Sequence, residues 1–217
     1  MHSAVFDLDG TIYAENSMVA FLESFHASHA PSRALALRAS RSLPGRAAWR
    51  AANSLTHRDA FRAFALATLR GSSRDALLEA VPAYVDRLAS RSIAEVMARL
   101  ESYRANGTRL LLASASLEPI VAEVARRLGM AGWVASIPAT RDGVYTGRWE
   151  TDVRGMKLTA LLEKYPDVNS FDVVTDNFDD GDLIGASQRA IAVVEPMHAA
   201  RWKARYGVRL ETIELRS

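Results

Sequence analysis

The stretch "VFDLDGT" at residues 5–11 decides the fold class. It places two carboxylates, Asp7 and Asp9, two positions apart, directly after an apolar run that begins almost at the first residue. We expect residues 3–9 to form a short buried strand, in which residues two apart point to the same side. Because ligands bind beyond the carboxyl ends of the strands in open parallel sheets, the two acids predict a site at that edge.

The composition is that of a globular chain with a substantial core. The chain has 217 residues, of which 49% are hydrophobic and 24% are charged, enough for one domain or for one domain with an insert. The net charge is only +2 although the isoelectric point is near 9.1. This balance is weak evidence for nucleic acid, so we expect no nucleic-acid partner. Nothing in the sequence indicates the oligomeric state.

The sequence favours a cytoplasmic location. It contains no cysteine, which fits a reducing compartment. Its start, "MHSAVFDLDG", has neither a basic region nor an apolar stretch long enough for a signal peptide. No later run approaches the roughly 18 apolar residues that a membrane span needs. We therefore expect a cytoplasmic protein without a membrane span.

The rest of the chain divides into a helical stretch and an alternating one. From Ile12 to Ser92 the pattern is helical and rich in Ala, Leu and Arg, whereas from Ile93 onward helical patterns alternate with short apolar runs. The runs that predict strands are 109–113, 171–175, 190–194 and 209–215. Between them, Asp142-Gly143 flanked by β-forming residues predicts a hairpin.

This organisation predicts an α/β fold. Strands that alternate with helices form a parallel sheet with helices on both faces. We assign residues 1–12 and 93–217 to this core domain. Residues 13–92 are predicted to be an inserted, all-helical cap domain.

Polar residues recur at the ends of the predicted strands. Ser114 and Ser116 follow the second strand, and "TDNFDD" at 175–180 follows the strand "FDVV". A single acid after a strand is usually a solvated loop residue or a helix N-cap. Repetition at several strand ends favours a functional site instead.

In this order the motifs resemble those of the haloacid dehalogenase-like phosphatase superfamily. They are "DLDGT" at 7–11, a strand that ends in Ser114, Lys157 on a later helix, and "DNFDD" at 176–180. The helical insert, "LASAS" at 112–116 and "DGVYTG" at 142–147 resemble the subclass that contains phosphoserine phosphatase. The resemblance spans the whole chain and implies a Rossmann-like core with a helical cap.

The chemistry of the residues in the first motif points to phosphate esters. A carboxylate can attack a phosphate ester and become an aspartyl phosphate, which divides one difficult displacement into two easier ones. We assign this nucleophile to Asp7, and we assign to Asp9 the general acid and base that protonates the leaving alcohol and then activates water. Members of the superfamily that are not phosphatases lack the second acid, so Asp9 favours ester hydrolysis or phosphotransfer.

A magnesium site is expected beside the nucleophile. A hard cation with oxygen ligands relieves the repulsion between a carboxylate and a phosphate dianion. The resemblance implies Mg²⁺ bound by Asp7, the backbone carbonyl of Asp9, and Asp176. Asp180 is expected to orient the water shell or to supply a ligand, with Asp179 as its rival, and Thr11 is assigned a supporting place.

Two further groups are predicted to bind the phosphate. Ser114 ends its strand just before a helix whose N-terminus would point at the phosphate, whereas Ser116 is interpreted as that helix's N-cap. Lys157 opens a helix in which Leu158, Leu161, Leu162 and Tyr165 are predicted to be buried. A cation there opposes the helix dipole, which suggests a functional role for Lys157.

The insert leaves two interpretations open. Residues 24–58 contain no acid but carry His26, His29, His57 and the arginines Arg33, Arg38, Arg41, Arg46, Arg50 and Arg58. This pattern is typical of a solvated face on arginine-rich helices, and the alternative is a surface that attracts a polyanionic or lipid-phosphate substrate. Glu15 lies near the position where phosphoserine phosphatases place a glutamate that meets the substrate amine, but it is shifted by about one residue.

The sequence therefore predicts a Mg²⁺-dependent phosphomonoesterase that acts through an aspartyl phosphate on a small phosphorylated metabolite, such as a phosphoserine-like ester, an amino-alcohol phosphate or a similar compound. One alternative is a phosphotransferase or phosphomutase on the same scaffold, which would pass the phosphate to an acceptor other than water. A second alternative is a catalytically silent module that binds anions. The sequence does not identify the physiological ester.

Overall fold

The computed structural model describes residues 2–42, 45, 49, 59–207 and 210–215. Its strands are β1 (Ser3–Phe6), β2 (Arg109–Leu117), β3 (Gly132–Arg141), β4 (Val144–Thr151), β5 (Phe171–Thr175), β6 (Arg189–Val194) and β7 (Leu210–Glu214). Its helices are α1 (Ser17–His29), α2 (Pro31–Arg41), α4 (Ala60–Ala67), α5 (Arg74–Leu88), α6 (Ala94–Ala105), α7 (Glu118–Arg127), α8 (Lys157–Lys164), α9 (Gly181–Ala186) and α10 (Pro196–Tyr206), with a 3₁₀ turn at Ala89–Arg91.

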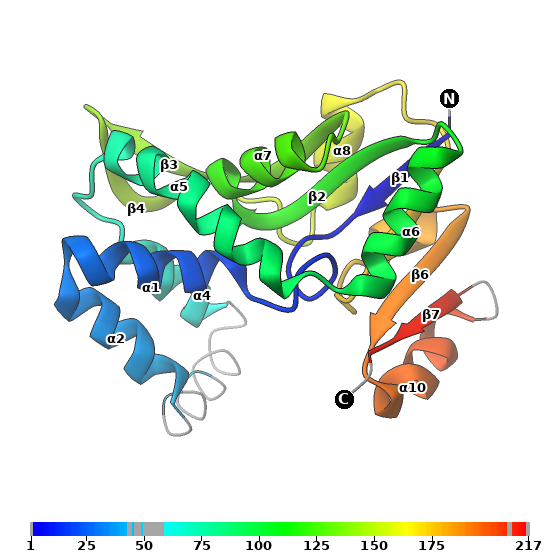
Figure 1. Ribbon diagram of the computed structural model, residues 1–217, viewed down its shortest axis with the longest axis horizontal. Coiled ribbons are helices and arrows are strands. Elements are labelled where there is room, and N and C mark those ends of the chain that lie inside the picture. Colours follow the sequence, from blue (N-terminus) through cyan, green and yellow to red (C-terminus); the bar gives the residue numbers. More distant parts are fainter. Residues whose placement is uncertain (1, 43–44, 46–48, 50–58, 208–209, 216–217) are drawn as a thin grey trace.

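The strands of the described residues form one seven-stranded sheet in the order β4-β3-β2-β1-β5-β6-β7 (Figure 1). All neighbours are parallel except β3 and β4, which are antiparallel. The predicted α/β fold with a parallel sheet is confirmed. Strand β5 coincides with the predicted run 171–175, and β2 continues four residues beyond the predicted end at 113.

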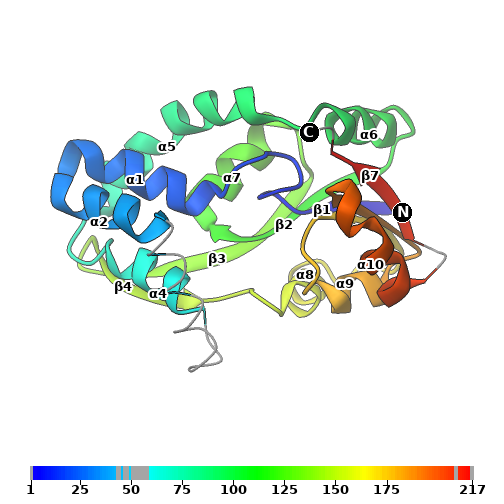
Figure 2. The same cartoon turned by 90° about the horizontal axis from the view of Figure 1, so that it is seen from below.

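Helices cover both faces of the sheet (Figure 2). Alternate residues of β1 point to opposite faces: Phe6 belongs to one hydrophobic cluster and Val5 to the other. The first cluster includes Leu100 of α6 and Val121 of α7. The second includes apolar residues of α8, α9 and α10, among them Trp202. The result is the three-layer arrangement that the alternating sequence predicts.

In the described residues, the insert between β1 and α6 contains α1, α2, α4 and α5; the first three lie to the left in Figure 1, and α5 runs from there toward the centre. Its two connections to the sheet run side by side, because the Ile93 N–H donates to the Ile12 carbonyl at 2.9 Å and the Ala14 N–H donates to the Arg91 carbonyl at 2.9 Å. Buried residues of the insert, such as Phe21, join the same hydrophobic cluster as α7. The division at residues 12/13 and 92/93 remains a prediction.

The hairpin expected at Asp142-Gly143 is confirmed and connects β3 to β4. Both turn residues have positive φ angles, 51° and 77°, as a two-residue turn of type I′ requires. The hairpin reaches the insert, where the Tyr145 N–H donates to the Ser72 carbonyl at 2.9 Å and the Gly71 N–H donates to the Tyr145 carbonyl at 2.9 Å. It therefore ties one edge of the sheet to the loop between α4 and α5.

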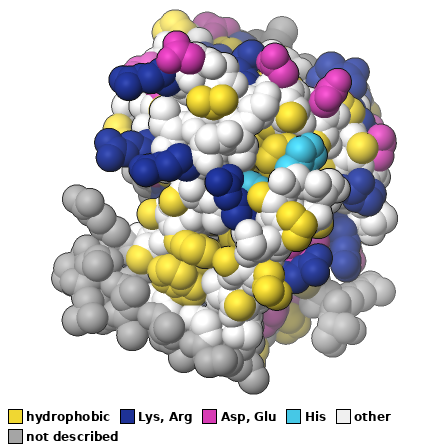
Figure 3. Space-filling model, turned by 90° about the vertical axis from the view of Figure 1, so that its left-hand side faces the viewer, with side chains coloured by type: hydrophobic (Ala, Val, Ile, Leu, Met, Phe, Trp, Pro, Cys, Tyr) yellow, Lys and Arg dark blue, Asp and Glu magenta, His cyan; other side chains and the backbone are white. Residues whose placement is uncertain are grey.

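The described arginines of the insert contact other protein groups. Arg38 and Arg41 both pair with Glu23, and Arg33 donates to the Thr68 carbonyl at 2.8 Å. Figure 3 shows basic and acidic side chains interspersed on this end of the molecule. These contacts favour the interpretation as a solvated face. The predicted residues Arg46, Arg50, Arg58 and His57 lie outside the described residues.

No helix in the described part of the chain is long and apolar enough to cross a membrane.

The packing of α1 against α4 buries a histidine. The His26 side chain is 0% exposed, and its Nε2 lies 3.0 Å from the Thr68 hydroxyl, which itself donates to the Ala65 carbonyl. Nε2 therefore donates, and Nδ1 is a buried atom without a partner. Burial, with the charge of Arg33 and the nearby His29 adding, lowers the pKa of His26 to about 4.

We expect His26 to destabilise the folded state in acid. Between pH 6.5 and about 4 the unfolded chain takes up a proton at this residue that the folded chain does not, so the contribution of His26 to the free energy of unfolding falls as the pH falls, by roughly 3 kcal/mol at most. His26→Gln should remove this contribution, so the difference in the free energy of unfolding between the variant and the unaltered chain, measured by urea unfolding, should change with pH over that range. His198→Gln, at an exposed position on α10, is the control and should keep the pH dependence of the unaltered chain. Equal slopes for His26→Gln and the unaltered chain would contradict this assignment.

Candidate active site

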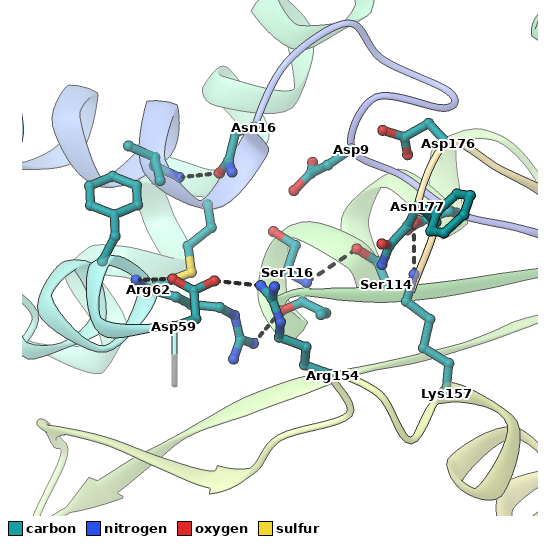
Figure 4. A pocket seen from close by; sticks show the side chains of 16 residues that line it. Asp9, Asn16, Asp59, Arg62, Ser114, Ser116, Arg154, Lys157, Asp176 and Asn177 are labelled. Carbon is teal, nitrogen blue, oxygen red and sulfur yellow. Dashed lines mark hydrogen bonds and ion pairs between the residues drawn. The ribbon is translucent and has the colours of Figure 1, made fainter. Parts of the chain in front are cut away.

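The carboxyl ends of β1, β2 and β5 surround a cavity of about 300 Å³ (Figure 4). Five of the predicted site residues line it: Asp7, Asp9, Ser114, Lys157 and Asp176. The two supporting residues, Thr11 and Asp180, contact this lining from behind.

Asp7 is the first residue after β1 and is fixed on both sides. Its N–H donates to the Val174 carbonyl of β5 at 2.9 Å, which continues the sheet ladder by one bond. Its side chain accepts a hydrogen bond from Lys157 Nζ at 2.7 Å, and the residue is only 7% exposed. The carboxylate therefore stands in a fixed place at the end of the central strand.

Lys157 lies between two carboxylates. Its Nζ is 2.7 Å from Asp7 and 2.8 Å from Asp180, and the residue is 2% exposed. Burial opposes the charge of this ammonium, but the two carboxylates outweigh burial and raise the pKa of Lys157. Asp180 also accepts from the Thr175 hydroxyl at 2.8 Å and from Asn177 Nδ2 at 3.1 Å.

These contacts distinguish the two rival acids of the last motif. Asp180 is 1% exposed and holds Lys157, whereas Asp179 is exposed to solvent. Thr175, the last residue of β5, donates its hydroxyl to Asp180. The structure thus favours Asp180 as the residue that supports the site, by positioning Lys157.

Lys157 occupies the buried stripe of α8, four residues before the buried Leu161. This register explains why the predicted buried face is partly wrong, since Leu162 is 40% exposed. A lysine in the stripe is accommodated because its charge is paired inside the protein. Because Lys157 is the first residue of the short helix α8, its side chain reaches Asp7 at the end of β1 and Asp180 after β5.

Asp9 does not lie in the first strand, which ends at Phe6, so the prediction of a strand over 3–9 is wrong at its end. The chain turns instead: the Leu8 carbonyl accepts from the Ile12 N–H at 3.0 Å, and Gly10 adopts a φ of 72°. Asp9 still lines the cavity, and its carboxylate accepts from the Ser17 N–H at 2.9 Å. Burial, with the charge of Asp7 adding, raises the pKa of Asp9 to about 7.

Asp176 lies against the turn after β1. Thr11 donates its hydroxyl to Asp176 at 3.0 Å and accepts from the Asp176 N–H at 2.8 Å. A Cβ on Gly10 would come within 2.1 Å of the Asp176 carboxylate, so only glycine permits this approach. Burial and the charge of Asp7 raise the pKa of Asp176 to about 7.

The oxygen ligands around Asp7 and Asp176 suit a hard divalent cation that needs few carboxylates. Asp7 and Asp176 provide two carboxylates in each other's field, and repulsion between them is what a cation relieves. Within the described residues there is no group of three or more acidic, histidine or cysteine side chains that could hold a metal. A site here would depend on two carboxylates, a backbone carbonyl and water, which is the pattern that Mg²⁺ accepts.

Ser114 is buried, and its hydroxyl accepts from the Ser116 N–H at 3.1 Å. The prediction that Ser116 is an N-cap is wrong, because β2 continues to Leu117 and α7 begins at Glu118 without a side-chain cap. The Ser116 hydroxyl instead lies 2.7 Å from the Ser17 hydroxyl of α1. Ser114 thus lies within β2 rather than after it, and Ser116 connects the end of this strand to the insert.

Two ion pairs between the insert and the sheet were not predicted. Arg62 of α4 pairs with Asp152 after β4 at 2.5 Å, and Asp59, just before α4, pairs with Arg154 at 2.5 Å. Arg62 also donates to the Ala115 carbonyl at 2.6 Å, beside Ser114. Figure 4 shows the pair of Asp59 with Arg154, with Arg62 beside it, on the insert side of the cavity. The one sequence signal was that Asp59 is the first acid after the acid-free stretch 24–58.

Glu15 does not line this cavity. It borders a separate one together with Tyr84, Arg87 and Arg91, and lies 3.9 Å from the Arg91 guanidinium. Its neighbour Asn16 faces the candidate active site instead, where its side chain also caps α1 by accepting from the Val19 N–H.

The chain belongs to the haloacid dehalogenase-like hydrolases, whose family model matches residues 4–174. The resemblance inferred from the motifs is therefore confirmed, and with it a hydrolase. No curated protein sequence matches the chain.

Among the solved structures that share its fold are the following three. A protein of unknown function from Bordetella pertussis Tohama I is 23% identical, with a TM-score of 0.72 over 98% of both chains. A phosphoserine phosphohydrolase-like protein from Francisella tularensis is 17% identical, with a TM-score of 0.63 over 97% of this chain and 94% of the other. A phosphoserine phosphatase described as a phospho-aspartyl intermediate analogue is 15% identical, with a TM-score of 0.62 over 99% and 93%.

Lys157→Met should lower the free energy of unfolding by about 3–5 kcal/mol, because it leaves two buried carboxylates without their cation. Adding Asp180→Asn should recover part of that loss, since one of the two unpaired charges is then removed. Urea unfolding of both single variants and the double variant measures the coupling. Lys203→Met, at an exposed position of α10, is the control and should change stability little. Additive losses in the double variant would show that the pair is not energetically coupled.

Proposed function

We propose that the chain hydrolyses phosphomonoesters, with Asp7 as the nucleophile. The observation that carries the proposal is a buried carboxylate at the end of the central strand, held by Lys157 in a cavity that Asp9, Ser114 and Asp176 also line. One structural neighbour is a phospho-aspartyl intermediate analogue of phosphoserine phosphatase, which supports an aspartate in this role.

In the first step, a carboxylate oxygen of Asp7 attacks the phosphorus atom and the bond between phosphorus and the ester oxygen breaks. The leaving alkoxide takes a proton from the Asp9 carboxyl group, so the alcohol departs neutral. Asp9 is suited to this because its carboxyl lies in the same cavity and is held by the Ser17 N–H. The products are the free alcohol and a phosphorylated Asp7.

In the second step, the Asp9 carboxylate takes a proton from water as the water oxygen attacks phosphorus. The bond between phosphorus and the Asp7 oxygen breaks, which releases inorganic phosphate and restores both acids. Lys157 and the hydroxyl of Ser114 supply donors for the phosphate oxygens in both steps. Thr11 and Asp180 fix Asp176 and Lys157 in place.

We further propose that Asp7, the backbone carbonyl of Asp9, and Asp176 hold Mg²⁺. When bound, the cation would offset the repulsion between the Asp7 carboxylate and the phosphate dianion. The insert, residues 13–92, acts as a cap that excludes water and contacts the alcohol part of the ester. A cytoplasmic location is expected from the absence of cysteine.

Asp7→Asn should reduce phosphate release to the background rate while the chain stays folded, because an amide of nearly the same volume cannot form the acyl phosphate. Asp9→Asn should slow release by about 10²- to 10⁴-fold, the usual contribution of general acid–base catalysis. Phosphate release with Mg²⁺ and circular dichroism measure both effects.

The matched control is Asp179→Asn, an exposed acid of the same motif. It should retain nearly full activity. Turnover by Asp7→Asn at the rate of the unaltered chain would remove the proposed nucleophile, and phosphate transferred to added alcohols rather than to water would favour a phosphotransferase.

Removal of Mg²⁺ by EDTA should stop turnover, and added Mg²⁺ should restore it. Binding should also stabilise the fold by about 1.4 kcal/mol when Mg²⁺ exceeds its dissociation constant tenfold, which thermal unfolding detects without substrate. Asp176→Asn should shift that stabilisation to higher Mg²⁺ concentration. An unchanged Mg²⁺ titration in this variant would exclude Asp176 as a ligand.

A further inference from the structure

The side of the cavity that faces the insert is apolar where it is not already paired. Met18 and Val19 of α1 and Phe61 of α4 line it, opposite the acids that close β1 and β5. Val19 is buried, yet it is not a member of either hydrophobic cluster, so its side chain serves the cavity wall. An alcohol that leaves from the phosphate departs toward this wall.

A second hollow continues this wall away from the acids. It has a volume of about 350 Å³ and shares Asn16, Val19 and Phe61 with the first cavity. Its remaining described lining includes Trp49, whose ring lies 5.8 Å from that of Phe61, and Arg41, which is already paired with Glu23. Space and aromatic surface therefore extend beyond the position of the phosphate.

The charged groups on this side that belong to the described residues have partners within the protein. The Arg62 guanidinium bonds Asp152, the Ala115 carbonyl and Ser136, and lies 4.1 Å from the centre of the Trp149 ring. Its side chain is only 12% exposed, so it could bind a substrate carboxylate only by leaving Asp152 unpaired.

The second ion pair and the position of Glu15 also leave no unpaired charge on this side of the cavity among the described residues. Arg154 and Asp59 neutralise each other at 2.5 Å, and Glu15 lies on another cavity beside Arg91. A zwitterionic alcohol such as serine would thus meet no unpaired carboxylate or guanidinium on the described insert side. An apolar leaving group needs no charged partner of this kind.

We propose that the alcohol part of the substrate is apolar, an alkyl or aryl group that packs against Met18, Val19 and Phe61 and extends toward Trp49. This inference rests on the proposed phosphatase function and names the substrate class of the same site. Specificity then comes from apolar contacts of the insert, while the acids at the strand ends carry the chemistry.

The test is a series of straight-chain esters, ethyl to hexyl phosphate, assayed with Mg²⁺ beside O-phosphoserine and O-phosphoethanolamine. The alkyl leaving groups have nearly the same acidity, so differences in kcat/KM report binding of the chain. We expect kcat/KM to rise about two- to fourfold for each methylene that the pocket buries. We also expect hexyl phosphate to exceed both amine-bearing esters.

Two variants locate the effect. Val19→Thr replaces a methyl by a hydroxyl in the same shape, and Phe61→Ala shortens the wall, so both should reduce the rise along the series and act mainly on KM. Leu35→Ala removes an apolar side chain that is 66% exposed on α2 and should leave the series unchanged.

The outcomes separate the two proposals. Hydrolysis of ethyl phosphate without any increase toward hexyl phosphate, or a preference for O-phosphoserine, would overturn the apolar pocket and leave the phosphatase intact. Hydrolysis of none of these esters would overturn the phosphatase itself and the inference with it. An unchanged rise in both Val19→Thr and Phe61→Ala would also exclude this wall.

Discussion

The site depends on one buried ammonium, that of Lys157, held between the carboxylates of Asp7 and Asp180 at 2.7 and 2.8 Å. The three residues come from the end of β1, the start of α8 and the loop after β5. Each charge is compensated only when all three segments converge, and an uncompensated charge at this depth costs several kcal/mol. The ion pairs therefore fix how α8 packs against the sheet and, through it, where the nucleophile stands.

The sheet order makes that convergence possible. Strand β1 lies between β2 and β5, so Ser114 near the end of β2 and Asp176 just after β5 flank Asp7 on its two sides. Because the three strands are parallel, their carboxyl ends meet at one edge. This part of the site could be predicted from the sequence, since it requires only the apolar runs, the residues that follow them and the rule for open parallel sheets.

Other parts could not be predicted, because they depend on backbone details or on distant partners. The turn that places Asp9 is formed by hydrogen bonds from the N–H groups of residues 11–13 to the Leu8 carbonyl. The alternating hydrophobic pattern of the sequence does not reveal these bonds. Ser116 stays in β2 because the pairing with β3 shifts register after Ser114. The pairs of Arg62 with Asp152 and of Asp59 with Arg154 join residues 90 and 95 positions apart, so no local pattern indicates them.

Those two ion pairs also help to explain how the charges of the insert are neutralised. A stretch that is rich in arginine and free of acid suggests a surface that attracts anions, yet its described arginines pair with Glu23 or bond the backbone. At the cavity, Arg62 and Arg154 are likewise neutralised by acids. The contacts that hold the insert against the sheet thus neutralise the described charged groups on this side of the cavity, which Met18, Val19 and Phe61 also line. Under the proposed function, the same interactions that fix the insert in place would favour an uncharged leaving group.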